Sequence, residues 1–138
     1  MTRRAALFLG AALLAAAAHA RACGYCVEDK IAAVYDHASV LRAAQQRHSL
    51  VYFAIVGDLR ANEATRREIA AAAAALKGVD ADSVRVSLPA ASLALAFDAQ
   101  AVSLATLEST LSRRLSTQRL ALGVLRVVAP PRSLVGAR

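Results

Sequence analysis

The spacing of apolar residues changes along this chain in an order that restricts the folds it can adopt. Residues 50–56 form a continuously apolar run before Gly57, which predicts a central β-strand covered on at least one face. Asn62 can cap a helix that Gly78 would end, and Ser103 can cap another helix. Each expected helix carries one apolar stripe at helical spacing. The stripes are Ile69, Ala73 and Leu76 in the first and Leu104, Leu107, Leu111 and Leu115 in the second.

Between and after these helices the apolar period shortens to two residues, which predicts strands. Residues 84–88 and 93–97 alternate apolar with polar or small residues on either side of a turn at Pro89. A last strand is expected at residues 120–128, with a β-bulge at Gly123. Residues 49–129 therefore predict a ferredoxin-like βαββαβ order, in which right-handed crossovers place both helices on one face of the sheet.

Residues 27–46 are expected to form one amphipathic helix ahead of that sheet. Its apolar positions recur at helical spacing, and its carboxylates are expected to face water. The apolar positions are Val27, Ile31, Val34, Ala38 and Leu41, and the carboxylates are Glu28, Asp29 and Asp36. The expected fold class is thus α+β, a ferredoxin-like βαββαβ sandwich preceded by an N-terminal amphipathic helix. Asp98, which ends a strand, is expected to cap or turn the chain.

The first 20 residues have the features of a cleaved signal peptide. Arg3 and Arg4 precede a 14-residue apolar run, and an A-x-A cleavage site ends at Ala20. A membrane anchor would need roughly 20 apolar residues, so no stable membrane span is expected. Cleavage after Ala22 would leave Cys23 at the N-terminus, but lipoprotein anchoring is not expected, because Ala20 stands where such signals usually carry leucine. The protein is expected to be periplasmic or secreted.

We divide the chain into a signal peptide (1–20), a segment with the cysteines and the amphipathic helix (21–48), a ferredoxin-like domain (49–129) and a tail (130–138). Without the signal, 118 of 138 residues remain, which suits one domain. They include 15 basic and 10 acidic residues, so the net positive charge is small. Since no aromatic residues interleave the arginines, nucleic acid is not expected as a partner.

Cys23-Gly24-Tyr25-Cys26 holds the only two cysteines of the chain. Two thiols at this spacing can bind one soft metal ion, take part in disulfide exchange, or form a structural disulfide that closes a small loop. A helix start favours the thiolate form, and two thiolates suffice for Cu(I), whereas structural zinc almost always takes four ligands. His37 would lie roughly 16 Å from Cys26 along a continuous helix, and His48 alone leaves zinc short of ligands. Cys23 and Cys26 are therefore the candidate metal ligands, with Cu(I) as the candidate ion.

Motifs of hydrolytic and nucleotide-dependent enzymes do not occur in the sequence. There is no G-x-S-x-G, no H-E-x-x-H and no G-x-x-x-x-G-K. We therefore expect a protein that is not an enzyme and has no catalytic residues.

Three stretches in the second half of the chain resemble heavy-metal-associated domains, the small modules of copper chaperones and metal-pumping ATPases. They are residues 78–88, GVDADSVRVSL, and the segments ALAFD at 94–98 and VSLATL at 102–107. The resemblance covers residues 49–129 and implies a ferredoxin-like fold. That family carries its metal-binding CxxC in the loop after the first strand, where this chain has Gly-Asp-Leu-Arg-Ala-Asn at residues 57–62. The thiol pair instead lies about thirty residues upstream, on the N-terminal extension.

The Cys-Gly-Tyr-Cys motif also resembles that of periplasmic disulfide isomerases, although no strand is expected before Cys23 as their thioredoxin fold requires. The sequence thus favours an exported protein that binds or relays a soft metal ion through Cys23 and Cys26. Ligand exchange through a three-coordinate intermediate would pass the ion on. The alternatives are a protein-interaction module with a degenerate heavy-metal-associated fold, and a periplasmic thiol-disulfide redox protein.

Overall fold

The computed structural model describes residues 26–131. The expected signal peptide, Cys23 and residues 132–138 of the expected tail lie outside the described residues. The described elements follow in order: α2 (Val27–Ala32), α3 (His37–Gln46), β1 (Ser49–Gly57), α4 (Glu63–Ala74), β2 (Val79–Ser87), β3 (Ser92–Phe97), α5 (Leu104–Leu115), a 3-10 turn η2 (Ser116–Gln118) and β4 (Leu120–Val128).

The four strands form one sheet in the order β2-β3-β1-β4, and every neighbouring pair is antiparallel. The expected α+β class with a four-stranded antiparallel sheet is confirmed. The apolar strand β1 lies inside the sheet, between β3 and β4. Among the helices of residues 26–131, none combines the length and the hydropathy that a bilayer crossing requires.

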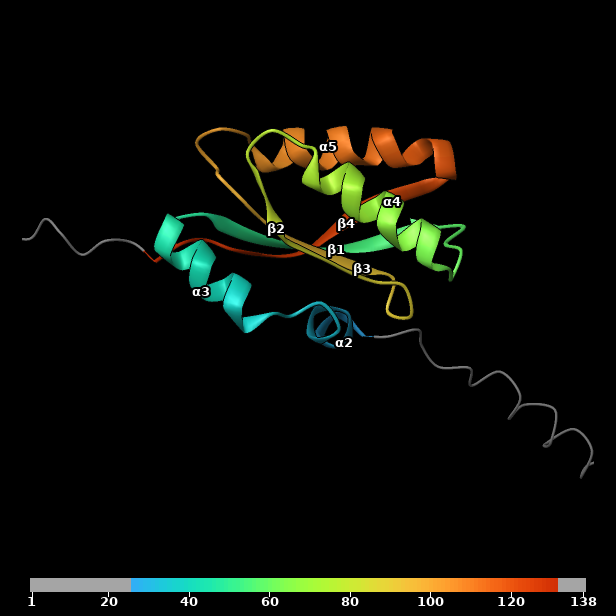
Figure 1. Cartoon of the computed structure of the whole chain (residues 1–138), viewed down its shortest axis with the longest axis horizontal. Coiled ribbons are helices and arrows are strands. Elements are labelled where there is room, and N and C mark those ends of the chain that lie inside the picture. Colours follow the sequence, from blue (N-terminus) through green and yellow to red (C-terminus); the bar gives the residue numbers. More distant parts are fainter. Residues whose placement is uncertain (1–25, 132–138) are drawn as a thin grey trace, which may run out of the picture.

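Helices cover both faces of the sheet (Figure 1). Helices α4 and α5 lie side by side on one face, where α4 contacts β2 and α5 contacts β4. The short helices α2 and α3 lie on the opposite face, against β1 and β3. The sheet is thus the middle of three layers, and β1 and β3 are buried from both sides.

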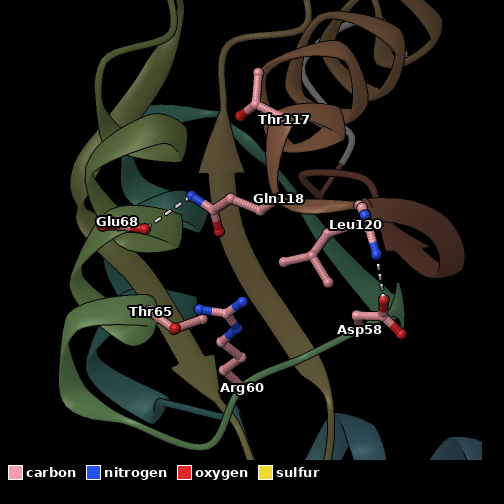
Figure 2. Close-up of a pocket in the computed structure, with 8 residues that line it drawn as sticks. Asp58, Arg60, Thr65, Glu68, Thr117, Gln118 and Leu120 are labelled. Atoms are coloured by element: carbon pink, nitrogen blue, oxygen red, sulfur yellow. Dashed lines mark hydrogen bonds and ion pairs between the residues drawn. The ribbon is translucent and has the colours of Figure 1, made fainter.

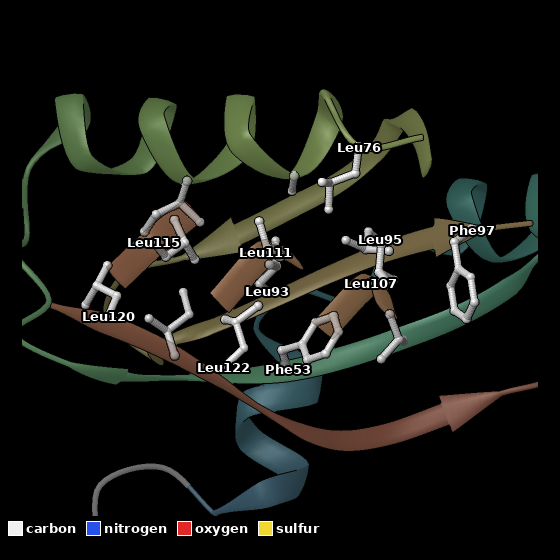
Figure 3. Close-up of a cluster of buried hydrophobic side chains, with 14 residues drawn as sticks. Phe53, Leu76, Leu93, Leu95, Phe97, Leu107, Leu111, Leu115, Leu120 and Leu122 are labelled. Carbon is white, nitrogen blue, oxygen red and sulfur yellow. The ribbon is translucent and has the colours of Figure 1, made fainter. Parts of the chain in front are cut away.

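The main core lies between the sheet and helices α4 and α5 (Figure 3). Alternate residues of β1 and β3 point into it and meet the apolar stripes that the sequence predicts for the two helices. The fully buried members include Phe53, Leu93, Leu95, Ile69, Leu107, Leu111 and Leu115. Both expected caps are confirmed, since Asn62 Oδ1 accepts from the Thr65 amide and Ser103 Oγ accepts from the Thr106 amide.

The expectation of one continuous helix over residues 27–46 is wrong, because the chain turns at residues 33–36 and forms α2 and α3. Asp36 adopts an extended conformation and caps α3: its carboxylate accepts from the Ala38 amide and from the Ser39 hydroxyl. An aspartate at this position favours a new helix start over continuation of the old one. Val27 and Leu41, expected on the apolar face, are exposed.

Two small apolar clusters attach α2 and α3 to the sheet. Ile31 and Val34 pack against Tyr52 and Ala94, with Leu125 beside them. Ala43 of α3 packs in a second cluster with Leu50 and Ala96. Because the chain turns at residues 33–36, each of the two short helices packs its own apolar cluster against a different part of β1 and β3.

Ion pairs connect the edge strand β2 to this layer. Asp36 Oδ2 lies 2.6 Å from Arg85 Nη2, and Arg42 Nε donates to Asp80 Oδ2 at 3.0 Å. The sequence-based expectation that Asp36 faces water is therefore wrong. Its carboxylate accepts hydrogen bonds from the Ser39 hydroxyl and the Ala38 amide and pairs with Arg85. Glu28 is also engaged, in an ion pair with Arg126 of β4.

We predict that Asp36 makes this layer sensitive to acid. The Ser39 hydroxyl, then the Arg85 charge, holds the pKa of the Asp36 carboxyl below its usual range. A depressed folded-state pKa gives stability that is present above the unfolded value and is lost as pH falls through the folded value. Asp36→Asn retains a helix-capping side chain but loses the charge. Its thermal midpoint should lie below that of the parent at pH 7, and the difference should shrink as pH falls below about 4. Parallel midpoints across that range would contradict this role.

Two strand details differ from the expectation. β2 begins at Val79, before the expected alternation, and its register shifts between Asp80 and Arg85. The buried Ser83 hydroxyl fills that irregularity by accepting from the Ala96 amide and donating to the Asp80 carbonyl. The bulge expected at Gly123 is wrong by two residues: Gly123 pairs regularly with Ala54, and the register shift leaves Leu125 as the extra residue. Leu125 packs against the cluster under α2, which explains the shift there.

Candidate functional site

Cys26 is the described member of the expected thiol pair, and it is exposed at the N-cap of α2. The expectation that the motif meets a helix start is confirmed at this residue. The Cys26 thiol donates to Asp29 Oδ2 at 3.1 Å and makes no capping bond to the backbone. Cys23 lies outside the described residues, so the structure places only one of the two candidate ligands.

Helix α2 is attached to the sheet at several points, so Cys26 stands on a fixed support. Ile31 and Val34 are buried against Tyr52, and Lys30 Nζ donates to the Ala90 carbonyl at 2.7 Å. Glu28 pairs with Arg126. Burial raises the pKa of the Tyr52 hydroxyl, and the nearby Tyr35 adds to the shift. These contacts hold a helix of only 6 residues that would not be stable alone.

The surroundings of Cys26 are acidic, because Glu28 and Asp29 occupy the first turn of α2. His37 is the first residue of α3, is exposed, and has Nδ1 3.3 Å from the Tyr35 hydroxyl. His48 precedes β1, and its Nδ1 is buried without a hydrogen-bond partner among the described residues. Within residues 26–131, no three or more histidine, cysteine and carboxylate side chains form a group that could hold a metal ion.

The loop between β1 and α4 is where the resembling family carries its thiols, and here it has a different geometry. Gly57 has a φ of +123°, and a Cβ placed on it would lie 2.1 Å from the Arg119 carbonyl oxygen. Asp58 pairs with Arg119 at 3.7 Å. The loop is thus packed against the start of β4 by backbone contact.

A polar cavity of about 370 Å³ opens beside this loop (Figure 2). Its walls come from the β1–α4 loop, the first two turns of α4 and the connection between α5 and β4. They comprise Asp58, Arg60, Thr65, Glu68, Thr117, Gln118, Arg119 and Leu120. No sequence pattern indicates this cavity, since Glu68 and Gln118, which share a hydrogen bond of 2.9 Å, lie 50 residues apart. Arg60 and Thr65 do not belong to any recognisable sequence motif.

A scan against protein-family models, a search of curated proteins and a search of solved structures each found no match to this chain.

Proposed function

We propose that the protein is exported and binds or relays a soft metal ion, Cu(I), through Cys23 and Cys26. The observation that carries the proposal is the position of Cys26, exposed at the first turn of a helix that the sheet holds in place. An exposed sulfur on a fixed support is open to an incoming ligand. Two thiolates satisfy Cu(I) and leave it under-coordinated, so that a third thiolate or thioether can attack and remove it.

We further infer that residues 49–129 form a ferredoxin-like domain related to heavy-metal-associated domains. The strand order β2-β3-β1-β4 and the two helical crossovers on one face support this assignment. The layer formed by α2 and α3 is an addition to that arrangement. In this proposal the thiol pair has moved from the β1–α4 loop to the extension, and the loop has lost its metal ligands.

The mature protein, reduced and free of oxygen, is expected to bind about one Cu(I) per chain, or one per two chains if the motif bridges a dimer. Cys26→Ser should abolish this binding, because a single thiolate does not retain the ion against a competing chelator. Metal analysis after desalting and competition with a chromophoric Cu(I) chelator measure both quantities. Stoichiometric binding that survives Cys26→Ser would place the site elsewhere and remove the proposal.

Two variants serve as controls for the ligand set. His37→Ala should leave Cu(I) affinity unchanged, because His37 lies at the start of a separate helix. Asp29→Asn removes the carboxylate that accepts from the Cys26 thiol but keeps a side chain of the same shape. Cu(I) binding should be retained in Asp29→Asn, since carboxylates are poor ligands for soft ions. Its loss would mean that Asp29 completes the site.

A second candidate function is a protein-interaction module, favoured by the apolar side chains at one sheet edge. Val124, Val127 and Val128 of β4 and Val56 of β1 are exposed. Exposed apolar residues on an edge strand favour contact with another chain. This reading gains support if the reduced protein binds no Cu(I). A redox protein would instead reduce insulin faster than a free dithiol at matched concentration.

A further inference from the structure

The polar cavity beside the β1–α4 loop contains hydrogen-bonding groups that the protein itself does not use. Four of its polar side chains pair with one another: Asp58 forms an ion pair with Arg119, and Gln118 donates a hydrogen bond to Glu68. Arg60 has no ion pair or side-chain hydrogen bond with any residue of the described chain. Figure 2 shows its guanidinium reaching up between Thr65 and Leu120, below Gln118. Of the two guanidinium groups that line the cavity, that of Arg60 therefore has no partner within the described chain.

Thr65 places a second hydrogen-bonding side chain in the cavity wall. It is only 9% exposed and lines the cavity. Its amide is used by the Asn62 cap, whereas its hydroxyl has no hydrogen-bond partner within residues 26–131. Its hydroxyl oxygen retains access to solvent on the side where Thr65 lines the cavity. The open cavity in front of it is where a hydrogen-bond partner would lie.

The charges around these groups indicate the class of ligand. The free guanidinium of Arg60 offers a planar fork of donors that matches a carboxylate or a phosphate. Asp58 and Glu68 also line the cavity and would repel a second negative charge on the ligand. Their presence favours a group with one negative charge over a phosphate dianion. The volume of about 370 Å³ suits a small molecule.

We propose that this cavity binds the carboxylate of a small molecule, with Arg60 as the ion-pairing residue and the Thr65 hydroxyl as a second donor. The site is separate from Cys26, because none of its lining residues belongs to α2 or its N-cap. In this proposal, the β1–α4 loop contributes Arg60 to a binding site for an organic anion. Binding is therefore independent of Cu(I).

Titration of the isotope-labelled mature protein with acetate, followed by NMR, tests the proposal. Acetate should cause saturable shift changes at Arg60, Thr65 and Gln118, with a dissociation constant in the millimolar range. Arg60→Gln should weaken binding at least about tenfold, the usual effect of losing a hydrogen bond to a charged group. Thr65→Val, which keeps the shape of the side chain, should weaken it by a smaller factor.

The matched control is Arg67→Gln, which removes an exposed arginine of α4 outside the cavity and should leave the acetate affinity unchanged. Cys26→Ser should also leave it unchanged, which separates this site from the metal proposal. Shift changes that do not saturate, or that persist in Arg60→Gln, would overturn the assignment. Tighter binding of inorganic phosphate than of acetate would overturn the choice of a carboxylate.

Discussion

Removal of residues 1–47 is expected to lower the thermal midpoint by about 10–20 °C while residues 49–129 still unfold cooperatively. The deletion takes away α2 and α3 and leaves the core between the sheet and helices α4 and α5 complete. That core contains the largest fully buried side chains, Phe53 and Phe97. The domain should therefore be weakened without losing its fold.

The size of the effect follows from what the two helices cover. Leu50 and Tyr52 are buried beneath them, and Ile31 and Val34 are buried in return. Each such side chain contributes about 1.5–3 kcal/mol when fully buried. Ordering the residues of the two helices costs much of that gain in conformational entropy. A net loss of about 2–3 kcal/mol corresponds to the expected shift for a domain of this size.

Deletion of residues 1–25 is the matched control, because both attachment clusters lie within residues 26–131. The thermal midpoint of this shorter deletion should stay close to that of the parent. Circular dichroism and calorimetry distinguish the outcomes. A non-cooperative transition after removal of residues 1–47 would show that α2 and α3 belong to one indivisible core.

The parts of the fold that sequence spacing predicted are those set by local interactions. Asn62 and Ser103 each cap a helix by accepting from the amide three residues onward. Both helix starts can therefore be recognised from a few neighbouring residues of the sequence. The alternation around residues 84–88 and 93–97 likewise identified β2 and β3. Asp98 turns the chain as expected, accepting from the Gln100 amide.

The features that the sequence did not predict depend on distant partners. The turn between α2 and α3 is supported by Asp36, whose ionic partner Arg85 is 49 residues downstream. The bulge at Leu125 depends on a cluster formed with Ile31 of α2, which no local pattern reveals. In the candidate site, the helix start at Cys26 was predictable from the helical spacing of apolar residues that begins at Val27. The cavity with Arg60 was not, because its walls meet only after the sheet has formed.

Gly57→Ala is expected to destabilise the protein by about 2–4 kcal/mol, the largest effect we predict for a single methyl group. Gly57 has a φ of +123°, a conformation that L side chains rarely adopt, so alanine is strained there before any contact is considered. Its Cβ would also lie 2.1 Å from the Arg119 carbonyl oxygen and 3.3 Å from the Leu120 Cα. Both neighbours are backbone atoms, so no side-chain rotation relieves the overlap.

Gly123→Ala is the matched control, because it adds the same methyl group to the neighbouring strand. A Cβ at Gly123 has no heavy atom within 4 Å, and its backbone is not in the left-handed region. We expect a change in stability of no more than about 1 kcal/mol, in the stabilising direction, since alanine restricts the unfolded chain. Urea unfolding of the two variants beside the parent measures the contrast. Because Gly57 pairs with Leu120 at the first residue of β4, the strain should act on the pairing of β4 with β1. Equal stabilities of the two variants would show that the β1–α4 loop moves away from Arg119 at little cost.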